Sequence, residues 1–170
     1  MPSESDPAAG VLLRPFERAD LDAIVALSLR AWDPFFTSFP DLVGPELAHA
    51  LHPDFPAEQT KVVTDACTDP DHHTAVAVDA GVVVGIAVVV LDHDTAIGEL
   101  HLIAVDPSHQ RRGIAGLLDD WAVGVMRTNG MRLATVGTGG DPAHAPARRA
   151  YERAAYTPIP VVHYFKLLDP

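Results

Sequence analysis

The chain has 170 residues and a formal net charge of −11, with 23 acidic residues against 12 Lys and Arg. This length suits a single domain with a hydrophobic core, and a hydrophobic content of 48% is ordinary for a soluble globular protein. The acidic balance argues against nucleic acid as the main partner, because phosphate contacts need clustered Lys and Arg. It is compatible with a cationic partner such as a free amine.

The N-terminal residues and the most hydrophobic run of the chain indicate where in the cell the protein is expected. No apolar run approaches the roughly 20 residues that span a bilayer, and residues 82–91 are the most hydrophobic segment. Residues 1–10 are polar and acidic and lack the regions of a signal peptide. We therefore expect a disordered N-terminal lead over residues 1–10, one domain over residues 11–168, no membrane partner and a cytoplasmic location.

The first third of the chain predicts a strand followed by helices. Residues 11–14 are typical of an edge strand, and apolar spacing predicts a helix from about Asp20 to Trp32. Residues 33–56 are interrupted by prolines and rich in Phe, so no regular element is expected there. A further helix is predicted over residues 57–67.

The remainder of the chain alternates strands with helices. Strands are predicted at residues 74–78, 82–91, 96–105, 131–136 and 161–168, and helices at residues 114–128 and 146–154. Asp79-Ala80-Gly81 joins the first two of these strands as a hairpin. This order predicts an α/β (α+β) fold in which helices cover a mixed sheet.

The most informative motif lies between the predicted strand 96–105 and the predicted helix 114–128. It reads Gln110-Arg111-Arg112-Gly113-Ile114-Ala115-Gly116. A glycine-bearing turn that opens a helix leaves backbone N–H groups unpaired, and together with the positive end of the helix dipole they attract phosphate. The motif lacks the Gly-Lys-Ser/Thr end of a Walker loop and the G-x-G-x-x-G spacing of a dinucleotide fingerprint. It predicts a phosphorylated cofactor that is held in another way.

The Q-x-x-G-x-A spacing resembles the acetyl-CoA-binding motif of the GCN5-related N-acetyltransferase (GNAT) family. The similarity extends to Glu99-Leu100-His101-Leu102-Ile103-Ala104-Val105-Asp106-Pro107, which resembles the fourth strand of the family, and to Arg148-Arg149-Ala150-Tyr151-Glu152-Arg153-Ala154-Ala155-Tyr156, which resembles its later Tyr-Glu helix. The resemblance implies a central, mixed, mostly antiparallel twisted sheet of about six to seven strands flanked by about four helices. It also implies an N-acetyltransferase that moves an acetyl group from acetyl-CoA directly to a primary amine in a ternary complex.

The same resemblance assigns the residues that hold acetyl-CoA as co-substrate. Backbone N–H groups from Arg111 to Gly116, with Gln110 beside them, correspond to the pyrophosphate site. Ile103, Ala104 and Val105 match the positions whose backbone pairs with the pantetheine arm. His144 stands where the family often has an Asn that contacts the cofactor. A helix start with small packing residues is the alternative interpretation of Gly113, Ile114, Ala115 and Gly116.

Two residues are candidates for the chemistry. Glu99 matches the strand carboxylate that acts as general base in one branch of the family, and strand alternation places His101 on the same face. Glu99, His101 or an ordered water can act as the general base. The alternative interpretation of Glu99 is a charged side chain that is exposed to solvent and has no catalytic role. Tyr151 matches the family's general acid, although Ala147, Ala150, Tyr151 and Ala154 also form an apolar helix face on which Tyr151 is a core aromatic.

The remaining expectations concern acceptor, partners and metals. Trp32, Phe35, Phe36 and Tyr164 occupy segments that build the acceptor pocket in the family and together allow an acceptor with an apolar part next to the amine, while core or interface packing is the alternative interpretation of each one. A small-molecule or peptide amine is expected as the acceptor. A non-catalytic acyl-CoA-binding module, another acyl donor and a hydroxyl acceptor stay open. Homodimers are frequent in that family. The scattered histidines and the lone Cys67 lack metal-ligand spacing, so no metal is expected.

Overall fold

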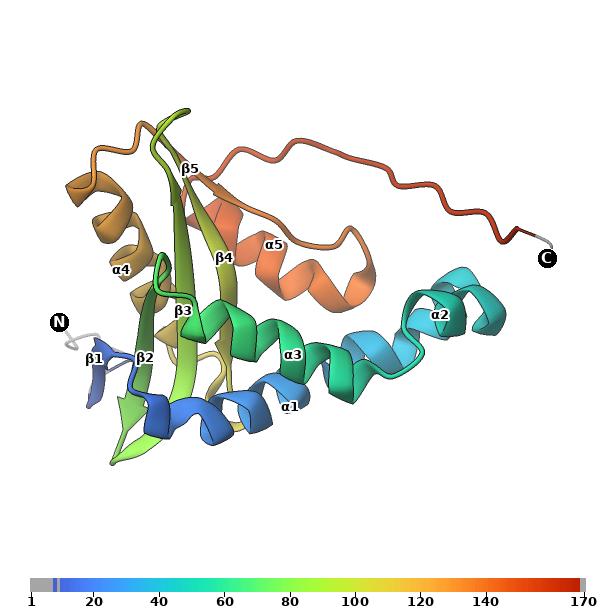
Figure 1. Ribbon diagram of the computed structural model, residues 1–170, viewed down its shortest axis with the longest axis horizontal. Coiled ribbons are helices and arrows are strands. Elements are labelled where there is room, and N and C mark those ends of the chain that lie inside the picture. Colours follow the sequence, from blue (N-terminus) through green and yellow to red (C-terminus); the bar gives the residue numbers. More distant parts are fainter. Residues whose placement is uncertain (1–7, 9, 169–170) are drawn as a thin grey trace, which may run out of the picture.

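Five strands form one open sheet with helices against both faces (Figure 1). The computed structural model describes residue 8 and residues 10–168. The strands lie in chain order: β1 (Val11–Pro15), β2 (His73–Asp79), β3 (Val82–Asp92), β4 (Ile97–Val105) and β5 (Leu133–Val136). Neighbours are antiparallel except β4 and β5, which are parallel. The expected mixed, mostly antiparallel sheet is confirmed.

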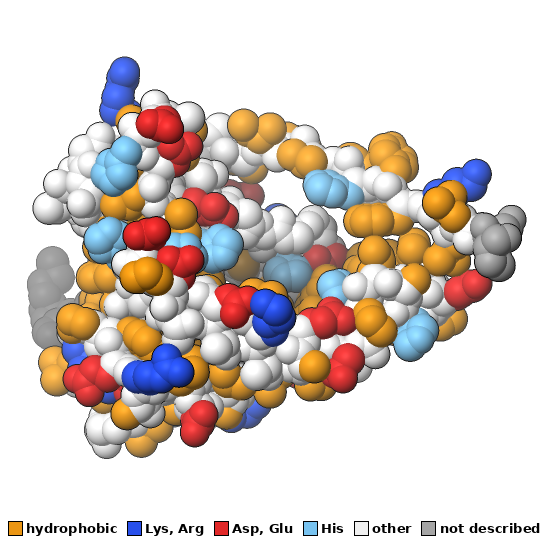
Figure 2. Space-filling model, viewed as in Figure 1, with side chains coloured by type: hydrophobic (Ala, Val, Ile, Leu, Met, Phe, Trp, Pro, Cys, Tyr) orange, Lys and Arg blue, Asp and Glu red, His pale blue; other side chains and the backbone are white. Residues whose placement is uncertain are grey.

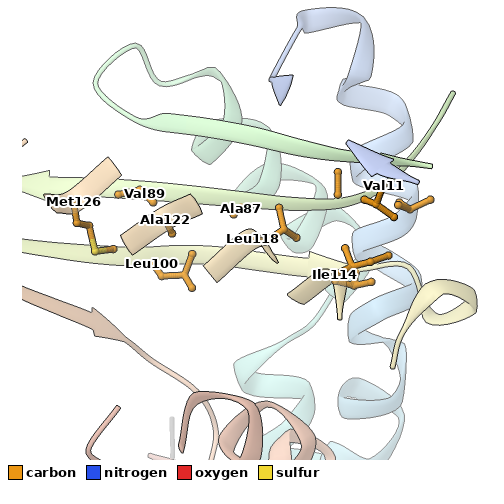
Figure 3. Packing of buried hydrophobic residues seen from close by; sticks show 11 residues of the cluster. Val11, Ala87, Val89, Leu100, Ile114, Leu118, Ala122 and Met126 are labelled. Atoms are coloured by element: carbon orange, nitrogen blue, oxygen red, sulfur yellow. The ribbon is translucent and has the colours of Figure 1, made fainter. Parts of the chain in front are cut away.

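The helices divide between the two faces of the sheet (Figure 1). They are α1 (Leu21–Val43), α2 (Pro45–Leu51), α3 (Phe55–Thr68), α4 (Ile114–Thr128) and α5 (Ala145–Arg153). One core cluster lies between the sheet and α4 and includes Val89, Leu100 and Leu118 (Figure 3). A second cluster lies between the sheet and helices α1 and α3 and includes Ile24 and Val63. The sheet is therefore buried on both faces and forms a rigid support for the segments that leave it.

A β-bulge in β4 changes which side chains face which core. Val88 pairs with Leu102 while Val89 pairs with Leu100, so His101 is the extra residue. Leu100 packs in the α4-side cluster, whereas Leu102 packs in the α1/α3-side cluster. Regular alternation would put these two leucines on the same face. The bulge thus divides β4 into two parts of opposite phase at the point where candidate site residues lie.

The structure corrects the expectation that residues 33–56 are irregular. Helix α1 continues to Val43 through Pro34 and Pro40, and α2 follows directly. Each interior proline removes a helix hydrogen bond. Aromatic packing offsets that loss, because Phe36 stacks on Phe55 with ring centroids 3.6 Å apart and Phe35 lies 5.0 Å from Phe39.

The expectation of six to seven strands is wrong, because the C-terminal segment does not form the strand that was predicted there. Residues 157–168 form no strand, and the sheet has five strands within the described part of the chain. A strand needs a partner for its backbone, which a local apolar pattern cannot supply. Of the N-terminal lead expected over residues 1–10, residues 1–7 and 9 lie outside the described residues.

Candidate functional site

The segment after β4 is built as a braced turn. Asp106 receives hydrogen bonds from the backbone N–H and the hydroxyl of Ser108, at 3.0 and 2.5 Å, and it pairs with the Arg30 guanidinium of α1. Gln110 Nε2 donates to the carbonyl of Val105 at 3.2 Å. These contacts fix the path of the chain from the end of the strand to the start of α4.

The turn ends in a left-handed glycine that caps α4. Gly113 is the N-cap with φ +75°, and Arg111 also has a positive φ of +61°. The first helical hydrogen bond runs from Leu117 N–H to the Gly113 carbonyl at 3.0 Å. Within residues 10–168 no hydrogen bond is donated by the backbone N–H groups of residues 111–116. These groups form an open donor cradle at the positive end of the α4 dipole, which fits a phosphate.

Side chains around the cradle leave its mouth open. Ile114 is buried and anchors the helix start in the α4-side core, whereas Ala115 and Gly116 are exposed. A Cβ added at Gly116 would meet nothing within 4 Å. The side chain of Arg112 is engaged elsewhere, because its Nη1 is 2.8 Å from a carboxylate oxygen of Asp79.

An opening between β4 and β5 lies next to the cradle. Their parallel pairing runs from Ile97↔Leu133 to Leu100↔Val136 and stops there. Beyond the bulge at His101, residues 102–105 still pair with β3 and have no β5 partner among the described residues. The backbone on this side of Ile103 and Ala104 is therefore free to bind an extended ligand as an added strand would. The Val105 carbonyl instead accepts the hydrogen bond from the Gln110 side chain.

Tyr151 lies on α5 against the α4-side core, with its ring 5.8 Å from that of Tyr156. Burial, with a contribution from the Asp119 carboxylate, raises the pKa of Tyr151 to about 12. Its hydroxyl has no hydrogen-bond partner in the part of the chain that the structure describes. The group is therefore protonated at neutral pH and able to donate. Both interpretations of Tyr151, core aromatic and proton donor, agree with this geometry.

The carboxylate of Asp119, next to Tyr151 and Tyr156, was not identified from the sequence. Asp119 is buried in α4 and accepts a hydrogen bond from the Tyr156 hydroxyl at 3.0 Å. Burial raises the pKa of Asp119, while the Tyr156 hydrogen bond opposes that shift. The available signal was its position between Leu118 and Ala122 on the face of the helix that meets the sheet.

Glu99 and His101 lie together, as alternation predicted. His101 Nδ1 is 3.4 Å from Glu99 Oε1, and both side chains are partly exposed. Leu100 faces the α4-side core, so Glu99 faces the opposite side of the sheet, whereas Tyr151 belongs to the α4 side. The two candidate catalytic groups therefore approach from opposite faces, and no hydrogen bond joins them in the described chain.

His144 is held inside the loop between β5 and α5. Its Nδ1 lies 2.5 Å from Asp141 Oδ2, and its ring centroid is 4.8 Å from that of Phe35. Burial alone would raise the pKa of Asp141, but hydrogen bonds from His144 hold it below its usual value. The imidazole is thus oriented through one nitrogen, and its contact with a cofactor stays a prediction.

Aromatic side chains line the side of the molecule built by α1 and α2. Phe35, Phe39 and Asp141 are among the residues around a hollow of about 260 Å³, and Phe36, His52 and Phe55 are among those around a second of about 250 Å³. Of the residues expected at an acceptor pocket, Phe35 and Phe36 are present in these walls. Trp32 instead packs against the α1/α3-side core, and Tyr164 is 91% exposed and lines neither hollow.

The structure gives little support to a nucleophilic cysteine, a metal site or a membrane span. Cys67 is buried, and burial raises the pKa of its thiol to about 12, so the reactive thiolate is scarce at neutral pH. Among the described residues there is no group of three or more His, Cys, Asp or Glu that could hold a metal ion. Over the same part of the chain, no helix has both the length and the apolar character needed to cross a membrane.

The contacts of Asp106 with Ser108 and Arg30 predict how the free energy of unfolding changes at low pH. Burial raises the pKa of Asp106, but hydrogen bonds from Ser108 and Arg30 outweigh it and hold that pKa well below the usual 3.8. Its stabilising contribution is therefore present above about pH 4, the unfolded pKa of Asp, and is lost as the pH falls further. We expect Asp106→Asn to lower the free energy of unfolding by about 1–3 kcal/mol at pH 7.

Urea unfolding at pH 7 and at pH 3 measures this effect. The difference between the original protein and Asp106→Asn should shrink at the lower pH. Asp120→Asn is the control, because Asp120 is exposed on α4 and has no hydrogen bond or ion pair in the described chain. A difference that stays constant with pH would show that Asp106 does not stabilise as a carboxylate.

Comparison with known proteins gives a consistent result. The model of the acetyltransferase (GNAT) family matches residues 31–156. A mycothiol acetyltransferase from Beutenbergia cavernae is 37% identical over 68 residues, which is 40% of this chain and 22% of that relative. The chain thus matches only about a fifth of the length of this curated relative.

Solved structures share the fold. A GNAT-family protein from Desulfovibrio desulfuricans superposes with a TM-score of 0.64 at 26% identity, covering 85% of this chain and 83% of that one. An aminoglycoside N-acetyltransferase, AAC(6')-Iy in complex with CoA, gives a TM-score of 0.64 at 16% identity over 92% and 94% of the two chains. The ribosomal-protein-S18-alanine N-acetyltransferase of Escherichia coli gives 0.61 at 18% identity, over 85% and 76%.

Proposed function

This chain belongs to the acetyltransferase (GNAT) family, and on that premise we propose that it transfers an acetyl group from acetyl-CoA directly to a primary amine. The observation that carries the proposal is the donor cradle at residues 111–116 beside the unpaired β4 edge at Ile103 and Ala104. A pyrophosphate and an extended amide-bearing arm need these two features next to each other.

The residues that would hold acetyl-CoA fit its chemistry. The N–H groups of Arg111–Gly116 would bind the pyrophosphate, and exposed Gly113 and Ala115 permit close approach of the ligand. Ile103 and Ala104 would pair with the pantetheine amides. When bound, the cofactor supplies a thioester acetyl group. We retain His144 as a cofactor contact through its other ring nitrogen. Gln110, expected beside the pyrophosphate site, would support that site indirectly, because its hydrogen bond to the Val105 carbonyl keeps the turn on the strand.

Glu99 would remove the proton from the acceptor amine, since an ammonium has no lone pair with which to attack. Its carboxylate is partly exposed and adjacent to His101, so the proton can pass to the imidazole or to water. Tyr151 would donate a hydrogen bond to the departing sulfur. A hydroxyl pKa of about 12 exceeds a thiol pKa of about 8.5, so sharing of the proton in the transition state is favoured over its complete transfer.

The aromatic hollows and the acidic charge favour an amine that carries an apolar part. Relatives differ in acceptor, as their names show: an aminoglycoside for one and a ribosomal-protein alanine for another. A non-catalytic acyl-CoA-binding module shares the cradle and differs only in the use of Tyr151 and Glu99. Another acyl donor or a hydroxyl acceptor would use the same cradle.

Calorimetric titration of the purified protein with acetyl-CoA tests the cradle without knowledge of the acceptor. We expect saturable binding of one ligand per chain. A panel of amines with detection of released thiol then tests transfer, and acetyl-, propionyl- and succinyl-CoA are compared as donors. Absence of binding at millimolar ligand would overturn the proposal. Binding with no thiol release across the panel would favour the binding module.

A further inference from the structure

The bulge in β4 brings His101 next to a second histidine. His101 is the residue that β4 inserts opposite the Val88/Val89 step of β3, and a bulge re-aims the side chain of the extra residue. The centroid of its ring lies 5.7 Å from that of His72, which belongs to the segment between α3 and β2. Figure 2 shows histidine and acidic side chains mixed on the left half of this face, where Figure 1 places the sheet and the end of α3.

The His72 ring is oriented by a backbone carbonyl. Its Nδ1 lies 2.9 Å from the carbonyl oxygen of Ala66 near the end of α3. A carbonyl oxygen can only accept a hydrogen bond, so Nδ1 carries the hydrogen, and Nε2 of the neutral ring has the free lone pair. Ala66 is buried and the His72 side chain is 17% exposed, so the surrounding fold holds this orientation. His72 therefore offers Nε2 as a proton acceptor.

A carboxylate lies at each end of the histidine pair. His101 Nδ1 is 3.4 Å from Glu99 Oε1, and His72 Nε2 is 3.7 Å from Asp69 Oδ2. Asp69 is fixed in turn, because its Oδ1 accepts a hydrogen bond from the N–H of Asp71 at 2.9 Å, and its side chain is 43% exposed. In the described chain these two carboxylates and the rings themselves are the titratable groups in ion-pair or ring contact with the histidines. The groups form a series from the candidate base to the surface at the end of α3.

We propose that His72 is a proton-relay residue, through which the proton that Glu99 takes from the acceptor leaves the site by way of His101. The inference rests on the proposed acetyl transfer. An N–H bond of the acceptor ammonium breaks and Glu99 binds the proton. Glu99 passes it to Nδ1 of His101, whose ring gives its Nε2 proton to Nε2 of His72, directly or through one water molecule. His72 releases that proton to water beside Asp69. Glu99 is then a carboxylate again, both rings are neutral, and exchange with solvent restores the hydrogen on His101 Nε2.

The position of His72 gives this route its use. Glu99 and His101 are partly exposed in the free chain. An amine that reaches the Glu99 carboxylate must displace the water in front of it, so the direct path from Glu99 to bulk solvent is closed when the acceptor is bound. His72 lies on the far side of His101, at the end of α3, where the exposed Asp69 carboxylate keeps contact with water. The relay therefore stays open in the complex.

Turnover of an accepted amine at low buffer concentration tests the relay. His72→Ala should lower kcat about 10-fold, while the KM for the amine and the affinity for acetyl-CoA stay within about twofold. Free imidazole should restore most of the lost rate, because it can take the proton from His101. The matched control is His73→Ala, since His73 is the adjacent histidine and its side chain is exposed and has no hydrogen bond or ion pair in the described chain. A kcat that does not change in His72→Ala, or a loss that imidazole does not restore, would overturn the relay.

Nitrogen NMR of the histidine rings, without acceptor or acetyl-CoA, tests the relay separately from the enzymatic proposal. We expect the neutral His72 ring to carry its hydrogen on Nδ1. Glu99→Gln and His101→Gln should each change the pH at which His72 takes up a proton, whereas His73 should respond to neither. A hydrogen on Nε2, or a His72 ring that responds to neither variant, would overturn the relay even where transfer is found. The expected tautomer and coupling without transfer to any amine would identify the enzymatic proposal as the one that fails.

Discussion

Replacing Gly113 by Glu should abolish measurable binding of acetyl-CoA. Gly113 has φ +75°, a conformation that costs an L-residue roughly 1–2 kcal/mol. The new side chain would stand at the exposed mouth of the cradle and bring a carboxylate next to the pyrophosphate. Like charge, bulk and the disturbed N–H directions act together. We expect the dissociation constant in calorimetric titration to rise more than about 100-fold, which is about 2.7 kcal/mol.

Two further variants separate the causes. Gly113→Ala adds the backbone strain without the charge, so its loss of affinity should be smaller. Gly124→Ala is the control within the same helix, because a Cβ there meets nothing within 4 Å and its φ is not positive. It should leave binding unchanged and stabilise α4 by about 0.5–1 kcal/mol. Retained affinity in a folded Gly113→Glu protein would place the phosphates elsewhere.

Local patterns predicted most of the fold. The helix over residues 114–128 is observed with those bounds, and the hairpin at residues 79–81 is confirmed with Ala80 and Gly81 at φ +48° and +83°. Each of these features is determined by a few neighbouring residues. That is why they could be predicted.

The features that were missed depend on residues far apart in sequence. The bulge at His101 is set by the register of β4 against β3, and it reverses the face of every residue that follows it in β4. Asp119 is buried, and its hydrogen-bond donor Tyr156 lies 37 positions later in the chain. Arg112, in the turn before α4, pairs with Asp79 at the end of β2. A sequence pattern contains none of these pairings.

The candidate site shows the same division. The cradle is local, so the glycine-bearing turn that opens α4 followed from the motif. The place where β4 and β5 part could not be predicted, because it depends on where their parallel pairing ends. The acceptor side was predicted least well. Helix α1 passes through two prolines because aromatic side chains from α1 and from the start of α3 pack together.

Replacing Tyr151 by Phe should lower kcat about 100-fold or more while the affinity for acetyl-CoA stays within about twofold. The change removes only the hydroxyl, and the ring keeps its packing against the α4-side core. The lost group would be the hydrogen-bond donor to the departing sulfur, a contact that strengthens as negative charge develops there. Steady-state kinetics with an accepted amine and calorimetric titration measure the two quantities separately.

Tyr156→Phe is the matched control for this experiment. It removes the neighbouring hydroxyl, whose partner Asp119 would then be buried without that hydrogen bond, so we expect about 1–3 kcal/mol less stability. The rate of transfer by the folded protein should change little, because Tyr156 is engaged with Asp119 and is not free to donate to a ligand. Unchanged turnover in Tyr151→Phe would remove Tyr151 as the donor. Equal losses of turnover in both variants would instead mean that the Tyr151–Tyr156–Asp119 cluster acts by holding α5 in place.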